Sequence, residues 1–203
     1  VVPKDNFVPW KYFSNPVGNA ILAGAFYRDK LVGSGAMIPE KINVFNSEKI
    51  VYKCTDLMTH PEHQRKGLSK KINELLIEET RKMDTPFVYT LCSNISTKSF
   101  LRNNWIFLER VTKFFKPQFI LKTNAIFNKS NLENLKIYNS ISNHLDAYKF
   151  KKNTSKISVS KTPDYLKWRT SNPNFSYKII CSYDNDNQVD GFLIFSISIN
   201  NLL

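Results

Sequence analysis

The sequence has only three cysteines, no signal peptide and no long apolar run, and each absence excludes a class of protein. Cys54, Cys92 and Cys181 are far apart, and each lies in an apolar stretch without a CxxC spacing. This excludes a disulfide-rich secreted scaffold and predicts reduced core thiols. No stretch of about 20 apolar residues is long enough to cross a membrane. Because a signal peptide is also missing, the sequence predicts a cytoplasmic protein without membrane insertion.

Acidic residues are also scarce, which leaves a strongly basic chain. Lysine and arginine together number 29 against 17 aspartates and glutamates, and the formal net charge is +12. Such an excess favours polyanionic partners: a nucleic acid, an anionic membrane surface or a phosphate-rich cofactor. The basic residues are spread along the 203 residues rather than grouped in blocks, so no specific nucleic acid is expected as a partner.

One stretch, residues 50–83, organises the N-terminal half. Its first part is apolar and partly β-branched, as in a strand (Ile50, Val51, Tyr52, Leu57 and Met58). Pro61 then ends the strand, because proline has no amide proton for a ladder. After Gly67, apolar residues recur at spacings of three, four and seven, which predicts an amphipathic helix (Leu68, Ile72, Leu75, Leu76 and Met83). We therefore expect a strand–loop–helix unit.

Four basic side chains surround the expected start of this helix, where they oppose the helix dipole. They are Arg65, Lys66, Lys70 and Lys71, whereas Glu74, Glu78 and Glu79 come later. The first helical amides after Gly67 have no intrahelical partner, and a cation near them is disfavoured by about 0.3–1 kcal/mol. A bound anion would reverse this effect, and phosphate is the usual one. A solvated basic turn without a ligand is the alternative.

The loop itself resembles the pyrophosphate loop of the GCN5-related N-acetyltransferase (GNAT) superfamily. That loop reads Q/R-x-x-G-x-G/A, with a proline three residues before it. The matching residues here are Pro61 followed by Gln64, Arg65, Lys66, Gly67, Leu68 and Ser69. Ser69 departs from the pattern, but a small hydroxyl side chain still lets the backbone approach a phosphate.

The order of the predicted elements resembles the GNAT fold, an α+β fold around a twisted, mostly antiparallel sheet. Strands at residues 20–29 and 31–38 form a hairpin, and a polar link at 39–49 leads to the organising stretch. A strand at 87–92, a helix capped by Ser96 and ending near Asn103, and a strand at 105–115 stopped by Pro117 follow. The resemblance covers about residues 18–117.

The resemblance also implies acetyl-CoA as the acyl donor and places its binding site. In this family the strand before the loop and the strand after the long helix splay apart, and the pantetheine arm lies between them. The backbone of Leu57, Met58 and Thr59 would bind the arm, and Asn94 would contact it. The loop residues from Gln64 to Ser69 would bind the pyrophosphate.

The implied reaction is direct attack of an amine on the thioester, which needs an oxyanion donor, a base and an acid. By resemblance, the donor is a backbone amide near Met58. Asp56 is the candidate base, directly or through water, because a carboxylate within a strand is costly unless it is used or paired. An ordinary core ion pair or a cap for the hairpin is the alternative. Phe100 stands where many members of the family have the tyrosine that acts as general acid. The thiolate would therefore be protonated by Tyr89 or by water, or it would leave without assistance.

The histidines form no recognisable metal-binding pattern. His60 and His63 flank Glu62 in one loop, and His144 lies in a distant polar segment. A metal site typically uses a helical i, i+4 pair or a wider set of ligands, and neither pattern is present. The sequence therefore predicts no metal, and it assigns the two loop histidines to the surface or to the adenine side of the cofactor.

The remaining chain suggests three parts. We expect a GNAT acyl-CoA-binding domain at residues 1–120 and a connecting region at 121–160, rich in asparagine, lysine and serine. This region has one helical pattern near residues 132–148. A partial GNAT-like repeat follows at 161–203. Since the chain starts without methionine and ends in a strand-like run, we expect it to be a fragment of a longer protein.

The evidence for a repeat is an internal similarity. Trp168-Arg169 precedes Ser171-Asn172-Pro173, as Trp10-Lys11 precedes Ser14-Asn15-Pro16. Each copy continues into a strand, a turn containing aspartate and a second strand containing glycine. Duplication explains this pattern, and chance similarity in an asparagine-rich chain is the alternative.

Together these features predict an acyl-CoA-dependent N-acyltransferase, most simply an acetyltransferase acting on the amine of a small molecule such as an amino sugar. The aromatic group at residues 10–13 is the best placed to contact this acceptor, although core packing also explains aromatic residues. Two alternatives remain: a tandem-GNAT aminoacyl transferase of the cell-wall type that uses charged tRNA, and a non-catalytic module that binds acyl-CoA or a polyanion. The sequence leaves open the identity of the acceptor and whether the protein forms a homo-oligomer.

Overall fold

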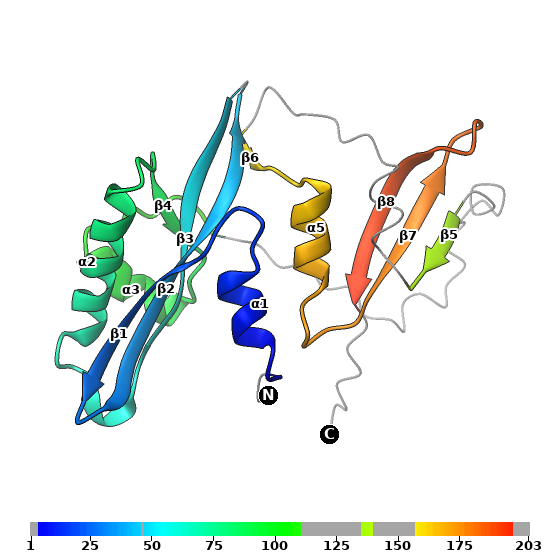
Figure 1. Ribbon diagram of the computed structural model, residues 1–203. Helices are drawn as coiled ribbons and strands as arrows, with labels where there is room; N and C mark the ends of the chain where they lie inside the picture. Colours follow the sequence, from blue (N-terminus) through cyan, green and yellow to red (C-terminus); the bar gives the residue numbers. More distant parts are fainter. Residues whose placement is uncertain (1–3, 46, 111–134, 140–156, 197–203) are drawn as a thin grey trace, which may run out of the picture.

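The computed structural model describes residues 4–45, 47–110, 135–139 and 157–196, which form two sheets and four α-helices (Figure 1). The helices are α1 (Phe7–Phe13), α2 (Leu68–Arg81), α3 (Asn94–Arg102) and α5 (Pro163–Thr170), and a 3-10 turn, η1, spans Pro61–His63. The strands are β1 (Ile21–Tyr27), β2 (Lys30–Val44), β3 (Ser47–Thr59), β4 (Val88–Thr90), β5 (Leu135–Tyr138), β6 (Ile157–Val159), β7 (Tyr177–Tyr183) and β8 (Val189–Ser196).

The first sheet has the order β1-β2-β3-β4, and β6 pairs with the far end of β2. Strands β1, β2 and β3 are antiparallel, whereas β4 is parallel to β3 and is reached through α2. The predicted hairpin around Asp29 is confirmed. Arg28 and Asp29 both have positive φ angles, of 47° and 62°, as a tight two-residue hairpin turn requires.

The polar link expected at residues 39–49 is wrong, because most of it is strand. β2 continues to Val44 and β3 begins at Ser47, with these two residues paired. The polar residues of this segment predicted a link rather than a strand. In the structure the Glu40 side chain is buried and accepts a hydrogen bond from the Tyr89 hydroxyl, and Lys53 Nζ lies 4.0 Å from its carboxylate. The partners therefore allow a charged residue within a covered strand.

Helices α2 and α3 cover one face of this sheet (Figure 1). The buried cluster consists of Met37, Tyr52, Cys54, Ile72, Leu76 and Phe100. Gly35 permits the close approach of α2, because a Cβ atom there would lie 2.9 Å from the side chains of both Ile72 and Leu76. The amphipathic helix predicted after Gly67 is thus confirmed, and it buries its apolar stripe against β2.

The cysteines follow the prediction in two cases of three. Cys54 and Cys181 are buried free thiols, whereas Cys92 is exposed, with its Sγ atom 3.3 Å from Thr97 Oγ1. The expectation of a core position for Cys92 is wrong, because the chain leaves the sheet after Thr90 and Cys92 lies in the loop before α3.

Three further predictions differ from the structure or lie partly outside the described residues. Ser93 rather than Ser96 caps α3, and its Oγ atom accepts a hydrogen bond from the Ser96 amide. Residues 105–110 have no regular secondary structure, and the remainder of the strand expected at 105–115 lies outside the described residues. Within the helical pattern at 132–148, Leu135–Tyr138 forms strand β5, and the other residues except Asn139 are not described.

The second sheet has the order β5-β7-β8, and the predicted hairpin between β7 and β8 is confirmed. Its buried centre consists of Ile179, Cys181 and Val189, against which Leu166 of α5 packs. The region expected to connect the two parts therefore contributes to both sheets, since β5 belongs to the second and β6 to the first. No helix in the described part of the chain is long and apolar enough to cross a membrane.

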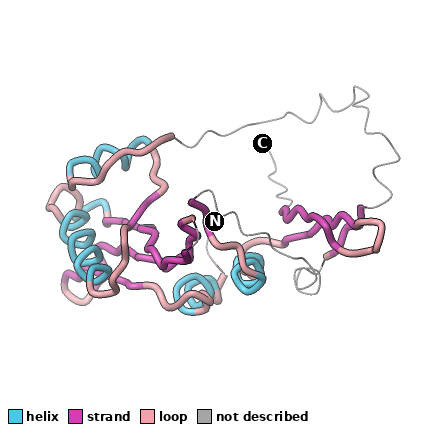
Figure 2. The backbone as a smooth tube through the Cα atoms, turned by 90° about the horizontal axis from the view of Figure 1, so that it is seen from above, coloured by secondary structure: helices cyan, strands magenta, loops and turns pink. Residues whose placement is uncertain are grey.

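Helices α1 and α5 lie side by side between the two sheets, as both views show (Figures 1 and 2). Trp10 of α1 and Trp168 of α5 stack, with ring centroids 5.4 Å apart. Their hydrogen bonds are reciprocal: Trp10 Nε1 donates to the Trp168 carbonyl at 2.7 Å, and Trp168 Nε1 donates to the Trp10 carbonyl at 2.9 Å. Equivalent atoms of the two helices thus make the same contacts in both directions.

The turns after these two helices also correspond. Asn15 and Asn172 are both buried, with 6% of each residue exposed. Each Oδ1 atom accepts a hydrogen bond from the amide two residues later, that of Val17 or Asn174. The similarity noted in the sequence therefore recurs in the conformation and environment of the chain.

Candidate active site

Strand β3 carries an irregularity where the proposed site begins. Its register with β2 shifts between the Thr55–Ala36 pair and the Met58–Ser34 pair. Asp56 lies in this β-bulge with a φ angle of 53°, in the left-handed region that aspartate tolerates better than most residues. A bulge re-aims side chains relative to the regular alternation of a strand.

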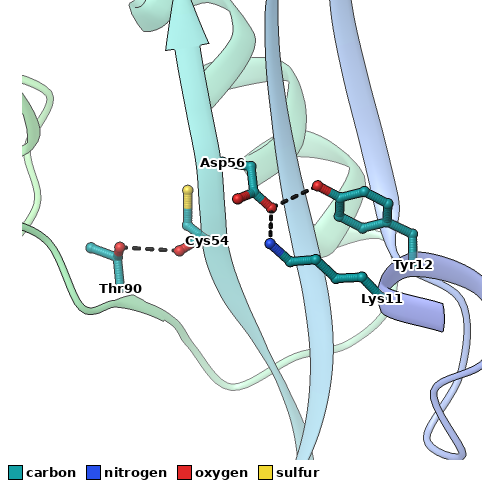
Figure 3. Close-up of polar contacts among 5 residues, drawn as sticks. All are labelled: Lys11, Tyr12, Cys54, Asp56 and Thr90. Atoms are coloured by element: carbon teal, nitrogen blue, oxygen red, sulfur yellow. Dashed lines mark hydrogen bonds and ion pairs between the residues drawn. The ribbon is translucent and has the colours of Figure 1, made fainter. Parts of the chain in front are cut away.

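The carboxylate of Asp56 has two partners on α1 (Figure 3). Lys11 Nζ lies 2.5 Å from Asp56 Oδ2, and the Tyr12 hydroxyl donates a hydrogen bond to the same oxygen at 2.7 Å. The Lys11 and Asp56 side chains are 19% and 27% exposed. Burial, and then the hydrogen bond and charge of Asp56, raise the pKa of Tyr12 well above its ordinary value. Tyr12 therefore stays protonated and remains a hydrogen-bond donor.

The pairing of β3 with β4 ends early. It covers the pairs Tyr52–Val88, Lys53–Tyr89 and Cys54–Thr90. Beyond them β3 continues to Thr59, whereas the segment after β4 leads into α3. Thr90 Oγ1 donates to the Cys54 carbonyl at 3.1 Å and marks the last contact (Figure 3). Beyond this point three apolar side chains are largely exposed: Met58 (61%), Leu91 (64%) and Ile95 (89%).

The loop after β3 leads into an uncapped helix. Gln64 Nε2 donates to the Thr59 carbonyl at 3.3 Å, and Arg65 has a positive φ angle of 61°. Gly67, the N-cap of α2, has a φ angle of 78° and no side-chain hydrogen bond that caps the helix. The Lys71 amide donates to the Gly67 carbonyl at 3.1 Å, so the amides before Lys71 in the first turn lack an intrahelical acceptor.

Phe100, which stands at the usual tyrosine position, and Tyr89, the alternative proton donor, are both engaged elsewhere. Phe100 is buried in the core and packs edge-to-face on Trp105, with ring centroids 4.9 Å apart. The Tyr89 hydroxyl donates a hydrogen bond to Glu40. Burial is the largest cause that raises the pKa of Tyr89 above its ordinary value, followed by the hydrogen bond to Glu40 and its charge. The proton of Tyr89 is therefore held firmly.

The predicted cofactor residues belong to β3, to the segment that leads into α2, and to α3. Leu57, Met58 and Thr59 form the end of β3, the residues from Gln64 to Ser69 follow η1 and include the first turn of α2, and Asn94 is the first residue of α3. The pairing of Lys11 and Tyr12 with Asp56 was not predictable from the sequence. These residues are 44 and 45 positions apart in the chain, and only the aromatic group at residues 10–13 gave any indication of a site on α1.

Comparison with known proteins identifies the N-terminal half. Residues 3–101 match the family model "Acetyltransferase (GNAT) domain", and no curated protein matches the chain. Similar solved structures include the glucosamine-6-phosphate N-acetyltransferase of Arabidopsis thaliana, with 17% identity, a TM-score of 0.42, and coverage of 48% of this chain and 67% of that chain.

Two other structures have comparable similarity. An aminoglycoside acetyltransferase from an uncultured soil metagenomic sample is 17% identical, with a TM-score of 0.47 and coverage of 58% of this chain and 76% of that chain. A predicted acetyltransferase from Clostridium acetobutylicum, solved with acetyl-CoA, is 10% identical, with a TM-score of 0.43 and coverage of 52% and 67%. The match of residues 3–101 to the family model and the strand–loop–helix unit within them show that this part of the chain is a GNAT acetyltransferase domain.

Proposed function

We propose that this protein is an acyl-CoA-dependent N-acyltransferase that transfers an acetyl group from acetyl-CoA to the amine of a small molecule, such as an amino sugar. The observation that carries the proposal is the uncapped start of α2 at Gly67, which follows η1 and the end of β3, where β4 no longer pairs with β3. These two features would supply an anion site and an open strand backbone.

The proposed cofactor site has a part for each chemical group of acetyl-CoA. The free amides at the start of α2 and the basic side chains of Arg65 and Lys66 would bind the pyrophosphate. The backbone of β3 from Leu57 to Thr59 would bind the pantetheine arm. Exposed apolar side chains of Met58, Leu91 and Ile95 would cover its methylene groups.

The proposed reaction needs only one proton acceptor from the protein. Asp56 takes a proton from the acceptor ammonium, directly or through water, and the free amine attacks the thioester carbon. A backbone amide near Met58 donates to the carbonyl oxygen as charge develops on it. The C–N bond forms, the C–S bond breaks, and the thiolate leaves. The Lys11 ammonium lies 2.5 Å from Asp56 Oδ2, and this ion pair is the alternative role for the carboxylate.

The proton for the departing thiolate has no obvious source in the described residues. Tyr89 donates its hydroxyl to Glu40 and has a raised pKa, so transfer of its proton to a thiolate would be unfavourable. This arrangement favours departure as the thiolate, with later protonation by water. Cys54 is an unsuitable substitute, because burial, with a smaller effect of the Asp56 charge, raises its pKa to about 12.

Replacing Asp56 by asparagine tests the assigned base. The asparagine side chain has the same size as that of aspartate and tolerates the left-handed backbone, but it cannot accept the proton. We expect Asp56→Asn to lower kcat for acetyl transfer to an amino sugar by about 10²–10⁴-fold, measured as thiol release from acetyl-CoA, while the Kd for acetyl-CoA changes little.

A matched control separates this role from the anchoring of α1. Lys11→Met breaks the same ion pair but leaves the carboxylate in place, so it should reduce kcat much less than Asp56→Asn. If both variants retain the kcat of the unaltered protein, or both lose it equally, Asp56 serves only to hold α1 against β3.

We also propose that residues 161–203 form part of a second GNAT-like unit, following a first unit at 1–120 and a connecting region at 121–160. The reciprocal contacts of Trp10 and Trp168 and the matching environments of Asn15 and Asn172 support a duplication. The alternative function, that of an aminoacyl transferase that uses charged tRNA, also implies a chain with two GNAT units. The phosphate loop at Gly67 favours acyl-CoA over that donor.

A further inference from the structure

Two histidines and one glutamate meet in the turn between β3 and the phosphate loop, which we define as residues 64–69. One potential ligand atom from each of His60, Glu62 and His63 lies within 4.8 Å of the other two. The sequence alone argued against a metal because the histidines lack an i, i+4 helical spacing. The 3-10 turn η1 changes this conclusion, because His60 is its N-cap and His63 its last residue, and the turn brings these two residues together.

The turn holds the two histidines in place. The His60 amide donates to the Val32 carbonyl of β2 at 2.8 Å, and the His63 amide donates to the His60 carbonyl at 2.9 Å. The two imidazole rings lie 5.9 Å apart between centroids. On its other side His63 contacts the Tyr27 ring at 5.1 Å, so the β1–β2 hairpin supports the cluster. The backbone geometry is therefore set before any ion binds.

We propose that His60, Glu62 and His63 bind one divalent transition-metal ion, and that Zn²⁺ fits this set best. Two imidazoles and one carboxylate are the protein ligands of a common open zinc site, which keeps a position for water or another ligand. Imidazole ligands select zinc, copper or nickel over magnesium and calcium, which prefer all-oxygen sites. The glutamate charge offsets part of the repulsion between the ion and the basic residues of the phosphate loop.

Only small side-chain movements are needed to form the site. Zinc bonds to nitrogen and oxygen are about 2.0–2.2 Å long, so ligand atoms around the ion lie roughly 3.5 Å apart. His60 and Glu62 are exposed and His63 is half-buried. Rotation of the two exposed side chains can therefore close the present separation without any change in the backbone of η1.

The position of the ion would couple it to acetyl-CoA binding, and this coupling rests on the proposed function. The cluster immediately precedes the phosphate loop, so a bound dication adds positive charge beside the segment that would hold the pyrophosphate. Zinc and acetyl-CoA should then strengthen the binding of each other, since coupling between two sites is reciprocal.

Calorimetric titration with zinc chloride tests the metal site itself. The protein should carry Cys92→Ser, because the exposed Cys92 thiol is a competing zinc ligand. We expect one Zn²⁺ per chain, with affinity reduced at least about tenfold in His60→Ala and in His63→Ala and less in Glu62→Gln. His144→Ala, which removes the third histidine of the sequence, is the matched control and should bind normally. Equal zinc binding by the His60→Ala/His63→Ala double variant and its parent would overturn the proposal.

A second titration distinguishes this inference from the proposed function. Acetyl-CoA is titrated into the same protein with zinc or with EDTA, and tighter binding with zinc is expected. Acetyl-CoA binding in EDTA together with no zinc binding would refute the metal site alone. Zinc binding at the three residues with no acetyl-CoA binding would refute the proposed function and leave the metal site supported. Equal acetyl-CoA affinity with and without zinc would refute the coupling.

Discussion

Gly67→Glu is expected to remove most of the affinity for acetyl-CoA, raising its Kd on the order of 100-fold. Gly67 is the N-cap of α2, and its φ angle of 78° favours glycine. A glutamate there places a negative charge beside the amides that would bind the pyrophosphate, and it occupies the space through which the phosphates approach the backbone. Calorimetric titration with acetyl-CoA measures the change.

The control for this variant separates charge from backbone strain. Gly67→Asn keeps a neutral residue that tolerates the left-handed region, and a Cβ atom at this position meets no described atom within 4 Å. We expect Gly67→Asn to bind acetyl-CoA far more tightly than Gly67→Glu, with a similar or smaller loss of folding stability. Unchanged affinity in Gly67→Glu would mean that the start of α2 is not the phosphate site.

The largest effect on stability is expected from the tryptophan pair that joins the two halves. Trp10→Ala and Trp168→Ala each remove a stacked ring and one of the two reciprocal hydrogen bonds. Truncation of a buried tryptophan costs about 3–5 kcal/mol, so Trp10→Ala, at a residue that is 7% exposed, should reduce the free energy of unfolding by an amount in this range. Trp168 is only half-buried, so Trp168→Ala should cost less. Urea denaturation followed by tryptophan fluorescence and circular dichroism measures the loss.

Combining the two substitutions tests whether the contacts act as one unit. Because the rings contact each other, the double variant should lose less than the sum of the two single losses, with a coupling energy of about 0.5–3 kcal/mol. Phe13→Ala, on the same helix α1 but 54% exposed, is the control and should change stability by less than about 0.5 kcal/mol. Additive losses would contradict a direct contact between α1 and α5.

The parts of the fold that depend on local patterns were predictable from the sequence. The apolar stripe beginning at Leu68 specified α2, and Pro61 specified the end of β3. The β1–β2 hairpin was predicted from two apolar runs separated by Asp29-Lys30. These features need only neighbouring residues and the periodicities of helices and strands. Local patterns were also enough to recognise the resemblance to the GNAT family, because the pyrophosphate-loop pattern lies within the continuous stretch at residues 50–83.

The features that depend on distant residues were not predictable in the same way. The segment at 39–49 was predicted as a polar link, because the partners of Glu40, Tyr89 and Lys53, are brought to it only by the folded sheet. The pairing of Asp56 with Lys11 and Tyr12 requires the bulge in β3 and the position of α1. The His60–Glu62–His63 cluster depends on a 3-10 turn that the sequence pattern does not distinguish from an ordinary loop.

The repeated Trp and Ser-Asn-Pro pattern indicated that two similar segments exist. The reciprocal contact between their tryptophans is seen only in the structure. Two matching short segments state only that similar pieces of chain occur twice. The hydrogen bonds between Trp10 and Trp168 add that the two pieces face each other with exchanged roles. This relation turns a weak sequence similarity into a specific proposal about how the halves pack.

The binding of acetyl-CoA is the central claim, and a thermal shift measurement tests it most directly. The unaltered protein is melted with acetyl-CoA, with ATP and with a short DNA duplex, each at two salt concentrations. A ligand at 100 times its Kd adds about 2.7 kcal/mol of stability, so acetyl-CoA alone should raise the melting temperature clearly, and Gly67→Glu should abolish this shift. No shift with acetyl-CoA, together with a salt-sensitive shift with DNA, would contradict the account and identify a module that binds polyanions.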